Sequence, residues 1–293
     1  MDITHENLNA LRSGFKTQFQ LGLKSAVSIG AILALTVPST TKLETYGWLK
    51  DWPMWRKFVG EKRIKSLEEQ SYQLSNDDYE TTVGIHKNKI RDDKLGIYGP
   101  MFKGWGKVAG KLADKLIFDA LKNGHSAKCF DGQYFFDTDH TVAGATVSNK
   151  SGNAANPPWF LVDLSQPLPP FIYQDRQSPE FNMVVDPEDS HVFKTGEFLA
   201  GGEARGAAGY TYWQLAHRCD GALNEANYKA AYDAMAALTD DEGEPLEVRP
   251  THIVFGASNR SAAKTLFKAM TGASGASNIY YEDVQMIDAP RLA

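Results

Sequence analysis

The chain has 293 residues with 42% hydrophobic and 11% aromatic content, enough to bury the core of one large domain or two modest ones. Its 31 basic and 36 acidic residues give a net charge of −5 without a dense Lys/Arg cluster, which argues against tight nucleic-acid binding. The only two cysteines, Cys129 and Cys219, form neither a disulfide framework nor a CxxC metal motif, which is typical of folding in a reducing cytoplasm. The most apolar window, 26–37, is too short to span a membrane.

The first predicted element is an amphipathic helix that begins after Thr4, a plausible N-cap. Its apolar residues recur at three- and four-residue spacing and therefore share one face: Leu8, Leu11, Phe15, Phe19 and Leu23. A single helix with such a stripe needs a partner, because each large apolar side chain left in water forgoes about 1.5–3 kcal/mol. That partner is either the chain's own core or a neighbouring subunit.

A dense aromatic cluster follows in a stretch that contains Pro53. Its members are Trp48, Trp52, Met54, Trp55 and Phe58. The pattern supports two interpretations equally. The cluster is either a corner of the core or a contact surface, since tryptophan is enriched at interface hot spots.

Residues 61–93 are highly charged and contain few large aliphatic side chains. Within them Tyr79, Thr81, Val83 and Ile85 alternate with polar residues, which is the period of a strand. A long polar segment with this period predicts an extended hairpin. Because an isolated hairpin is only marginally stable in water, we expect it to lie on another subunit.

A long helix is predicted over residues 100–122, with a length of roughly 35 Å at 1.5 Å per residue. Pro100 suits its first turn and Asn123-Gly124 its end. The expected apolar stripe is Trp105, Val108, Leu112, Leu116 and Ala120.

The remainder predicts short elements separated by loops, so the fold class is α+β. Residues 144–158 are expected to form a surface loop, and the glycine-rich runs 200–202 and 206–209 to interrupt the chain. Strands are expected at 159–162, 171–173, 253–255 and 279–287. Helices are expected at 224–238 and 261–270, the second with Ala262, Leu266, Phe267 and Met270 on one side.

Two groups of residues have side chains that bind metals or act in catalysis. Asp131, Asp137, Asp139 and His140 in the run DGQYFFDTDH could bind a divalent ion, although an Asp-rich turn bonded to nearby backbone is preferred because no further ligand is evident. His217 and Cys219 are close in sequence, but a Cys–His nucleophile pair is assembled in space, so unrelated side chains are preferred. No nucleotide-binding, zinc-protease or serine-hydrolase motif occurs in the sequence, and we expect no catalytic residues, metal or cofactor.

Several runs resemble the major head subunits of the Mu gpT family, in order along essentially the whole chain. They lie at 38–41, 44, 46–49, 81–84, 92–93, 96–100, 131–140, 159–163, 174–176, 209–210, 213–216, 242–246 and 289–292. DGQYFFDTDH at 131–140 is the most distinctive of them. One departure is the sequence Gly256-Ala257-Ser258, where the family tends to have a Val-Pro-Pro-like turn.

The resemblance implies an α+β, HK97-like capsid fold. It divides the chain into an N-terminal arm (1–45), an extended hairpin called the E-loop (46–95) and a peripheral domain (96–215) with a spine helix at 100–122 and a β-rich segment. An axial domain (216–278) and a C-terminal strand (279–293) that returns to the peripheral domain complete it. The expected inter-subunit contacts are Leu8, Leu11, Phe15, Phe19, Trp48, Trp52, Trp55 and Tyr79.

The function implied by the resemblance is a major capsid protein that self-assembles into the icosahedral head of a tailed phage around its double-stranded DNA. Its partners would be copies of itself in hexamers and pentamers, scaffolding, portal and decoration proteins, and DNA through weak non-specific contact, with no membrane. Assembly would occur in the bacterial cytoplasm, and we expect the N-terminal arm to be retained in the virion. The alternatives are a head-maturation hydrolase and a tail or adaptor protein.

Overall fold

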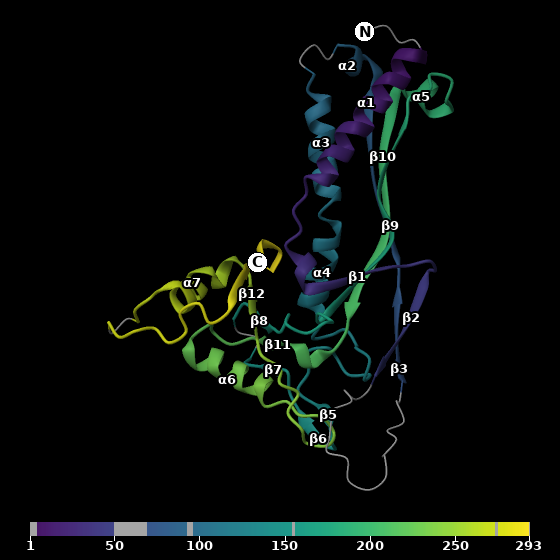
Figure 1. Ribbon diagram of the computed structural model, residues 1–293. Coiled ribbons are helices and arrows are strands. Elements are labelled where there is room, and N and C mark those ends of the chain that lie inside the picture. The colour runs from purple at the N-terminus through teal and green to yellow at the C-terminus, as the bar shows by residue number, and fades with distance from the viewer. Residues whose placement is uncertain (1–4, 50–68, 93–95, 154–155, 273–274, 293) are drawn as a thin grey trace.

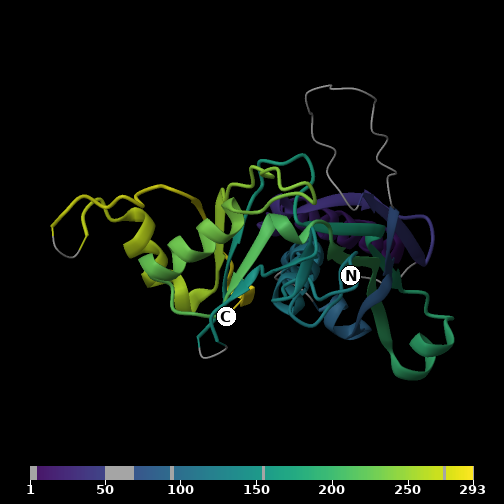
Figure 2. The same ribbon diagram turned by 90° about the horizontal axis from the view of Figure 1, so that it is seen from below.

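The computed structural model describes residues 5–49, 69–92, 96–153, 156–272 and 275–292. Figure 1 shows an elongated part built on long strands and helices, and a wedge that projects from its base. Seen from below, the wedge and the elongated part lie to opposite sides (Figure 2). Among the described residues, no helix is long and apolar enough to cross a membrane.

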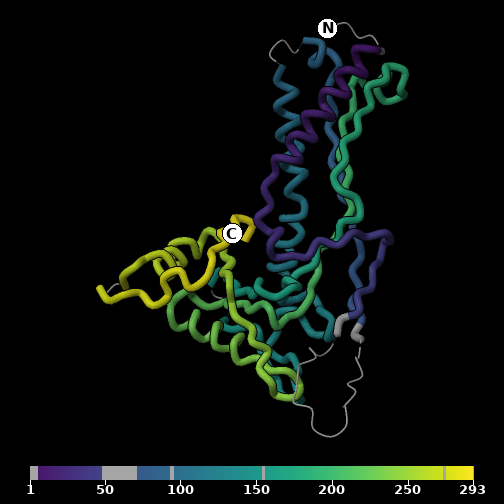
Figure 3. The backbone as a smooth tube through the Cα atoms, in the orientation of Figure 1, coloured from purple at the N-terminus to yellow at the C-terminus, as the bar shows by residue number. Residues whose placement is uncertain are grey.

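The elongated part contains a four-stranded sheet in the order β1 (Ala34–Pro38), β9 (Phe171–Val184), β10 (Glu197–Tyr210) and β4 (Asp77–His86). β1 is parallel to β9, and the other neighbours are antiparallel. Helices α1 (His5–Lys24) and α3 (Tyr98–Ala109) run beside this sheet (Figure 3). The short helices α2 (Lys87–Arg91) and α5 (Ser190–Thr195) lie at its far end (Figure 1).

The predicted spine helix is two helices, α3 and α4 (Leu112–Asn123), separated at Gly110 and Lys111. The break follows from close packing against the preceding segment. A Cβ on Gly110 would lie 2.5 Å from the Ala26 Cβ and 2.9 Å from the Leu23 carbonyl oxygen. The helix ends after Asn123 as predicted, but the apolar face differs, because Val108 is 68% exposed. In α3 the buried residues are Phe102 and Gly106 instead of Val108.

The glycine-rich runs expected to interrupt the chain lie inside the continuous 14-residue strand β10, so that prediction was wrong. These glycines leave room for neighbours. A Cβ on Gly206 would lie 2.7 Å from the Gln174 carbonyl oxygen, and one on Gly209 would lie 2.7 Å from the Tyr72 hydroxyl. The absent side chains therefore permit close packing without ending the strand.

The wedge contains a five-stranded sheet in the order β13 (Gln285–Asp288), β12 (His252–Phe255), β8 (Trp159–Val162), β11 (Ala216–Cys219) and β7 (Lys150–Ser151). Helices α6 (Glu225–Ala236) and α7 (Arg260–Lys268) accompany it. Every residue of β8 is buried, consistent with its central position. α6, β8 and β12 agree with the predicted elements. The last of the predicted helices ends earlier than expected, at Lys268, so Met270 lies beyond α7, where it is 70% exposed.

Strand pairing joins segments that the expected domain division separates. β8 falls within the segment 96–215 assigned to the peripheral domain, yet it pairs with β11 and β12 of the following segment. The C-terminal strand is shorter than predicted and pairs with β12, and the 3-10 turn η4 (Pro290–Leu292) that follows it contacts α4. The remaining 3-10 turns are η1 (Gly30–Leu33), η2 (Trp213–Leu215) and η3 (Ala257–Asn259).

Two hairpins lie outside these sheets, β2 (Leu43–Leu49) with β3 (Glu69–Ser75) and β5 (His140–Val142) with β6 (Ala145–Val147). The expectation that residues 46–95 form one extended hairpin is wrong for residues 77–86. These form β4, which pairs with β10 of the same chain along its whole length. Within the expected E-loop, residues 46–49 pair with 69–72, and residues 50–68 lie outside the described part of the chain.

Candidate assembly surfaces

The apolar stripe of α1 is covered by its own chain. Leu8 and Phe19 are 3% and 1% exposed, and Leu11 and Phe15 pack against the same cluster. The Phe15 and Phe102 ring centroids are 4.5 Å apart, and those of Phe19 and Phe181 are 5.2 Å apart. Of the two partners considered for this stripe, the chain's own core is the one that covers it, because α3 and β9 bury it.

Glycines bring α1 and α3 into backbone contact. A Cβ on Gly22 would lie 1.9 Å from the Lys103 carbonyl oxygen, and one on Gly106 would lie 2.0 Å from the Phe19 carbonyl oxygen. No larger residue fits at either position without separating the helices. The chain after α1 is also fixed, because the Asp114 carboxylate of α4 accepts hydrogen bonds from the backbone N–H groups of Ile29 and Gly30.

The other expected contact residues fall into three groups. Trp48 lies in β2 opposite Gln70. Trp52 and Trp55 lie outside the described residues. Tyr79 lies in β4, is partly buried against the main core and has the Lys115 ammonium 5.9 Å from its ring centroid. Tyr79 therefore belongs to the sheet of its own chain and not to the hairpin.

A polar cluster fixes the root of the β2–β3 hairpin. The Glu44 Oε1 accepts hydrogen bonds from the backbone N–H groups of Thr40 and Thr41, at 2.9 and 3.0 Å, and from the Ser39 hydroxyl at 2.9 Å. The bonds from Thr40, Thr41 and Ser39 lower the pKa of Glu44 to about 2. Three donors converge on one carboxylate oxygen, so the ionised form of Glu44 holds the turn into β2.

Asn76 closes the same cluster from the other strand. This residue is 3% exposed, and its amide donates to the Ser39 hydroxyl at 2.8 Å and to the Thr41 carbonyl at 2.9 Å. Its backbone N–H donates to the Lys42 carbonyl at 2.8 Å. Arg176 of β9 adds a bond from its guanidinium to the Ser39 carbonyl, at 3.2 Å. We call Ser39, Glu44, Asn76 and Arg176 the hairpin root.

A second set of contacts ties the hairpin to the long sheet. The Tyr46 hydroxyl donates to the Gln174 Oε1 at 2.7 Å, and Gln174 is fully buried. The Gln174 amide in turn reaches the Leu74 carbonyl oxygen at 3.4 Å. Tyr72 lies over Gly209 of β10, and burial raises the pKa of Tyr72 to about 12. The sequence motifs at 38–49 and 174–176 therefore meet in one place, which sequence reasoning did not foresee.

Some of the most exposed large apolar side chains lie near the ends of the molecule. Phe193 of α5 is 82% exposed, and Met270 and Ile279 beyond α7 are 70% and 80% exposed. α5 lies at the far end of the elongated part and α7 near the tip of the wedge (Figure 1). Burying side chains of this size against another molecule would be favourable, so we take these extremities as candidate assembly surfaces.

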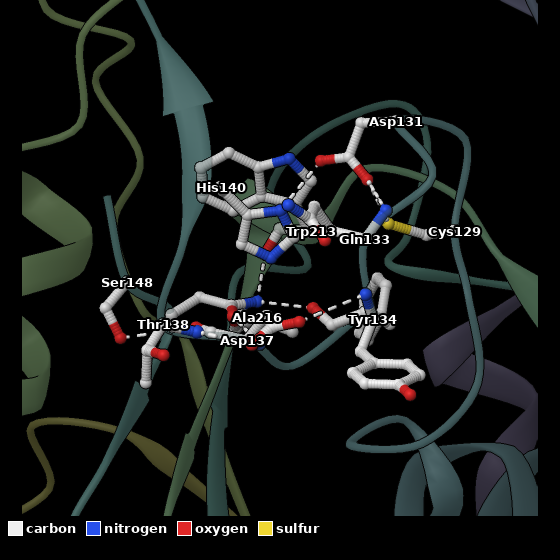
Figure 4. Close-up of polar contacts among 12 residues, drawn as sticks. Cys129, Asp131, Gln133, Tyr134, Asp137, Thr138, His140, Ser148, Trp213 and Ala216 are labelled. Carbon is white, nitrogen blue, oxygen red and sulfur yellow. Dashed lines mark hydrogen bonds and ion pairs between the residues drawn. The ribbon is translucent and has the colours of Figure 1, made fainter. Parts of the chain in front are cut away.

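The Asp-rich run forms the ordered turn that was preferred from sequence. Asp137 accepts from the backbone N–H groups of Tyr134 and Thr138, and Asp131 accepts from that of Gln133. Asp131 also bonds the buried His140, with Oδ2 and Nδ1 2.7 Å apart (Figure 4). His140 stacks on Trp213, with ring centroids 4.0 Å apart. Asp139 is exposed and does not join this group.

Cys129 completes the cluster and was not recognised from sequence. Its Sγ donates to the Asp131 Oδ1 at 3.1 Å, and the ligand atoms of Cys129, Asp131 and His140 lie within 4.8 Å of one another. Burial raises the pKa of Asp131, but the bonds from His140 and Cys129 outweigh it and hold that pKa below its usual value. Burial and the nearby Asp131 raise the pKa of the Cys129 thiol. The Cys129 thiol, the Asp131 carboxylate and the His140 Nδ1 thus bond one another without a metal, whereas the buried His140 Nε2 has no hydrogen-bond partner among the described residues.

His217 and Cys219 do not form a nucleophile pair. The His217 Nε2 lies 2.9 Å from the Ser151 hydroxyl, and burial lowers the pKa of His217 to about 4. No group in the described part of the chain bonds the His217 Nδ1, so the third residue that orients a catalytic base is absent there.

Comparison with known proteins places these features in a family. The family model described as "Mu-like prophage major head subunit gpT" matches residues 8–292. The chain belongs to this family. The major capsid protein of Escherichia phage Mu, a curated relative of this gpT-family chain, is 35% identical over 292 residues, and the match covers 96% of each sequence.

Solved structures give the same assignment for the fold. A chain from the procapsid of bacteriophage JBD30 superposes with a TM-score of 0.85 at 38% identity, covering 99% of this chain and 100% of that one. A chain from the JBD30 capsid decorated with minor capsid protein trimers gives a TM-score of 0.83 at 30% identity, covering 99% of both. The gpT-family chain has the HK97-like capsid fold, and its family is one of structural head subunits and not of enzymes.

Proposed function

We propose that this chain is the major capsid subunit of a tailed phage and that copies of it assemble as hexamers and pentamers into an icosahedral head around double-stranded DNA. The observation that carries the proposal is the full-length match to the gpT family, together with a TM-score of 0.85 to a procapsid subunit. Neither a tail protein nor a hydrolase accounts for a match of this length.

The shape and surface of the chain support the same function. A shell subunit needs contact surfaces at its extremities, and Phe193, Met270 and Ile279 provide large exposed apolar side chains there. It also needs a projecting element at a defined angle, and the hairpin root fixes where β2 and β3 leave the long sheet. Contacts of the hairpin with another subunit, including those of Trp48, Trp52 and Trp55, are part of this proposal.

The proposed partners follow from the family and the charge. One related capsid carries trimers of a minor capsid protein, so a decoration protein is a candidate partner here. Scaffolding and portal proteins are candidate partners during assembly in the host cytoplasm. With a net charge of −5, the chain is expected to contact packaged DNA only weakly and without sequence preference.

Electron microscopy of the expressed chain with its head-assembly partners tests the proposal. We expect closed shells of uniform size, whereas tubes or isolated rings would indicate a tail or adaptor protein. The variant Met270→Asp/Ile279→Asp is expected to remain folded and to lower shell yield, because it places charge on the exposed apolar tip of the wedge. Thr265→Asp, an exposed position on α7, is the matched control and is expected to assemble normally.

A further inference from the structure

The two edges of the long sheet differ in how well they suit pairing with another strand. β1 forms one edge, but it has only five residues and ends at Pro38, which lacks a backbone N–H. β4 forms the other edge with ten residues, contains no proline, and keeps an unbroken register against β10. A long, regular edge strand is a template for pairing with a further strand. β4 is therefore the edge that suits such pairing.

Alternate residues of β4 direct their backbone groups away from β10. The Lys87 N–H donates to the Gly196 carbonyl at 2.9 Å, and the register of β4 on β10 continues from this pair. In an antiparallel ladder, hydrogen-bonded residues alternate with residues whose N–H and C=O point outward. Odd-numbered residues of β4 therefore bond β10, and the even-numbered ones face the free edge: Asp78, Glu80, Thr82, Gly84 and His86. Among the described residues no strand pairs with that edge.

The edge is open on both faces of the sheet. Residues 80–84 are all exposed, although successive side chains of a strand point to opposite faces. Val83 shares the face of the buried Ile85, yet Val83 is 41% exposed. The helices that cover Ile85 therefore do not extend over the middle of β4, and the described part of the chain leaves room for a strand beside it.

Charge is divided along β4. Its first residues carry three carboxylates, on Asp77, Asp78 and Glu80. Opposite them in β10, Arg205 bonds Asp78 and Glu203 faces Glu80, so this end stays negative. The other end leads into α2, which contributes three cations, on Lys87, Lys89 and Arg91. The residue opposite His86 in β10 is Glu197, so this end stays positive.

This division selects the direction of pairing with a second copy. A parallel partner of the same sequence would place like charges opposite one another, which destabilises a pair of strands. An antiparallel partner places the acidic start of each β4 beside the basic end of the other. The charge pattern of β4 is thus complementary to itself in one direction only.

We infer that β4 pairs in antiparallel fashion with β4 of a second copy, across a twofold axis between their Thr82 residues. This register places outward-facing residues opposite one another, as hydrogen-bonded pairs require. Asp78 then faces His86 of the partner subunit, and Asp77 lies beside Lys87 of the partner subunit. The neighbouring register, centred on Thr81, would instead place Asp77 opposite Ile85 and leave the carboxylates without cations.

This pairing rests on the proposed function and adds to it how capsomers are joined. Subunits within a ring meet head to tail, whereas a twofold contact uses the same surface on both subunits. The β4 contact therefore lies between neighbouring rings of the shell. It joins the two four-stranded sheets into one continuous sheet across the axis.

Disulfide cross-linking in assembled shells tests the pairing. Across the axis the two Thr82 Cα atoms would be about 5.5 Å apart, within reach of a disulfide, and the two Glu80 Cα atoms about 14 Å apart. Oxidised shells of Thr82→Cys should therefore give about tenfold more covalent dimer on denaturing gels than shells of Glu80→Cys, the matched exposed control. The native Cys129 and Cys219 are buried and do not compete.

Three results would overturn the pairing: shells without a Thr82→Cys dimer, equal dimer at both positions, or a cross-link to a different head protein. The proposed function would stand in each case, because shells had formed. Failure of the unmodified chain to form shells would instead count against the proposed function.

A charge exchange tests the complementarity separately. Asp77→Lys and Lys87→Asp, each made alone, place like charges at both ends of the contact and should lower the yield of shells several-fold. The double variant restores opposite charges and should restore the yield. Thermal unfolding of the unassembled subunits should be unchanged, since both positions are exposed. A double variant that assembles as poorly as the single variants would overturn the pairing.

Discussion

The α1–α3 contact and the hairpin root both attach an N-terminal element to the same sheet, but by opposite means. In the first, glycines bring two backbones together over aromatic rings. In the second, a carboxylate and an amide gather hydroxyl and backbone groups around a turn. Apolar contact is non-directional and contributes most of the stability, whereas hydrogen bonds add little net energy but fix direction. The difference indicates that one region holds the subunit together and the other sets where the hairpin points.

The largest expected effect is on the apolar region. Phe19→Ala should lower the free energy of unfolding by about 3–5 kcal/mol, since it removes a ring that is 1% exposed. Urea denaturation of the unassembled subunit measures this. Leu21→Ala, at a 48% exposed position of the same helix, should change the free energy of unfolding by less than about 0.5 kcal/mol. Equal effects at Phe19 and Leu21 would contradict the packing described.

The glycine contact gives the next largest effect. Gly106→Ala should cost about 3 kcal/mol, because the new methyl group meets the Phe19 carbonyl oxygen and must separate the helices. Gly104→Ala, two positions away with no atom within 4 Å of its Cβ, should instead stabilise α3 by up to about 1 kcal/mol. Thermal unfolding of the two variants under identical conditions compares them. Stabilisation by both substitutions would show that helix propensity, not backbone contact, dominates.

A smaller and local effect is expected at the hairpin root. Asn76→Ala removes the amide bonds to Ser39 and Thr41 and should weaken the root by about 1–2 kcal/mol. Hydrogen exchange measured by mass spectrometry should show faster exchange in β2 and β3, with α1 and α3 unchanged. Asn182→Ala, at an exposed position of β9, should leave all peptides unaffected. Faster exchange throughout the chain would mean that the root also supports the core.

The smallest effect is a pH dependence confined to the root. The folded-state pKa of Glu44 is about 2, below the ordinary 4.5. The contribution of ionised Glu44 to the stability of the hairpin root is therefore fully present above pH 4.5 and is lost as the pH falls toward 2. Exchange at Thr40 and Thr41, corrected for intrinsic rates, should therefore accelerate over that range. Glu44→Gln should abolish the dependence, and Glu188→Gln at an exposed position should retain it. A profile that is the same in Glu44→Gln would assign the titration to another group.

Sequence periodicity located helices well but did not identify what covers them. The spacing of Leu8, Leu11, Phe15 and Phe19 predicts a shared face, but it contains no information on whether α3 or another molecule packs there. The glycines of β10 were interpreted as breakers, because their role depends on Gln174 and Tyr72, which only the folded chain brings near. Cys129 was missed for the same reason. The HK97-like fold was accessible only through the resemblance of ordered motifs, since no local rule predicts that β1 pairs with β9.

The hairpin root also has a consequence for the order of events during synthesis. Ser39 and Arg176, which share a hydrogen bond, are 137 positions apart. At the usual rate of translation, the ribosome needs on the order of ten seconds to make the intervening chain. β2 and β3 therefore leave the ribosome well before β9 can anchor them. The same holds for β1, the strand that pairs in parallel with β9. Contacts this distant in sequence also slow folding, because the chain must close a large loop before they form. Nascent subunits are thus kept from adopting the final hairpin direction until most of the polypeptide has left the ribosome.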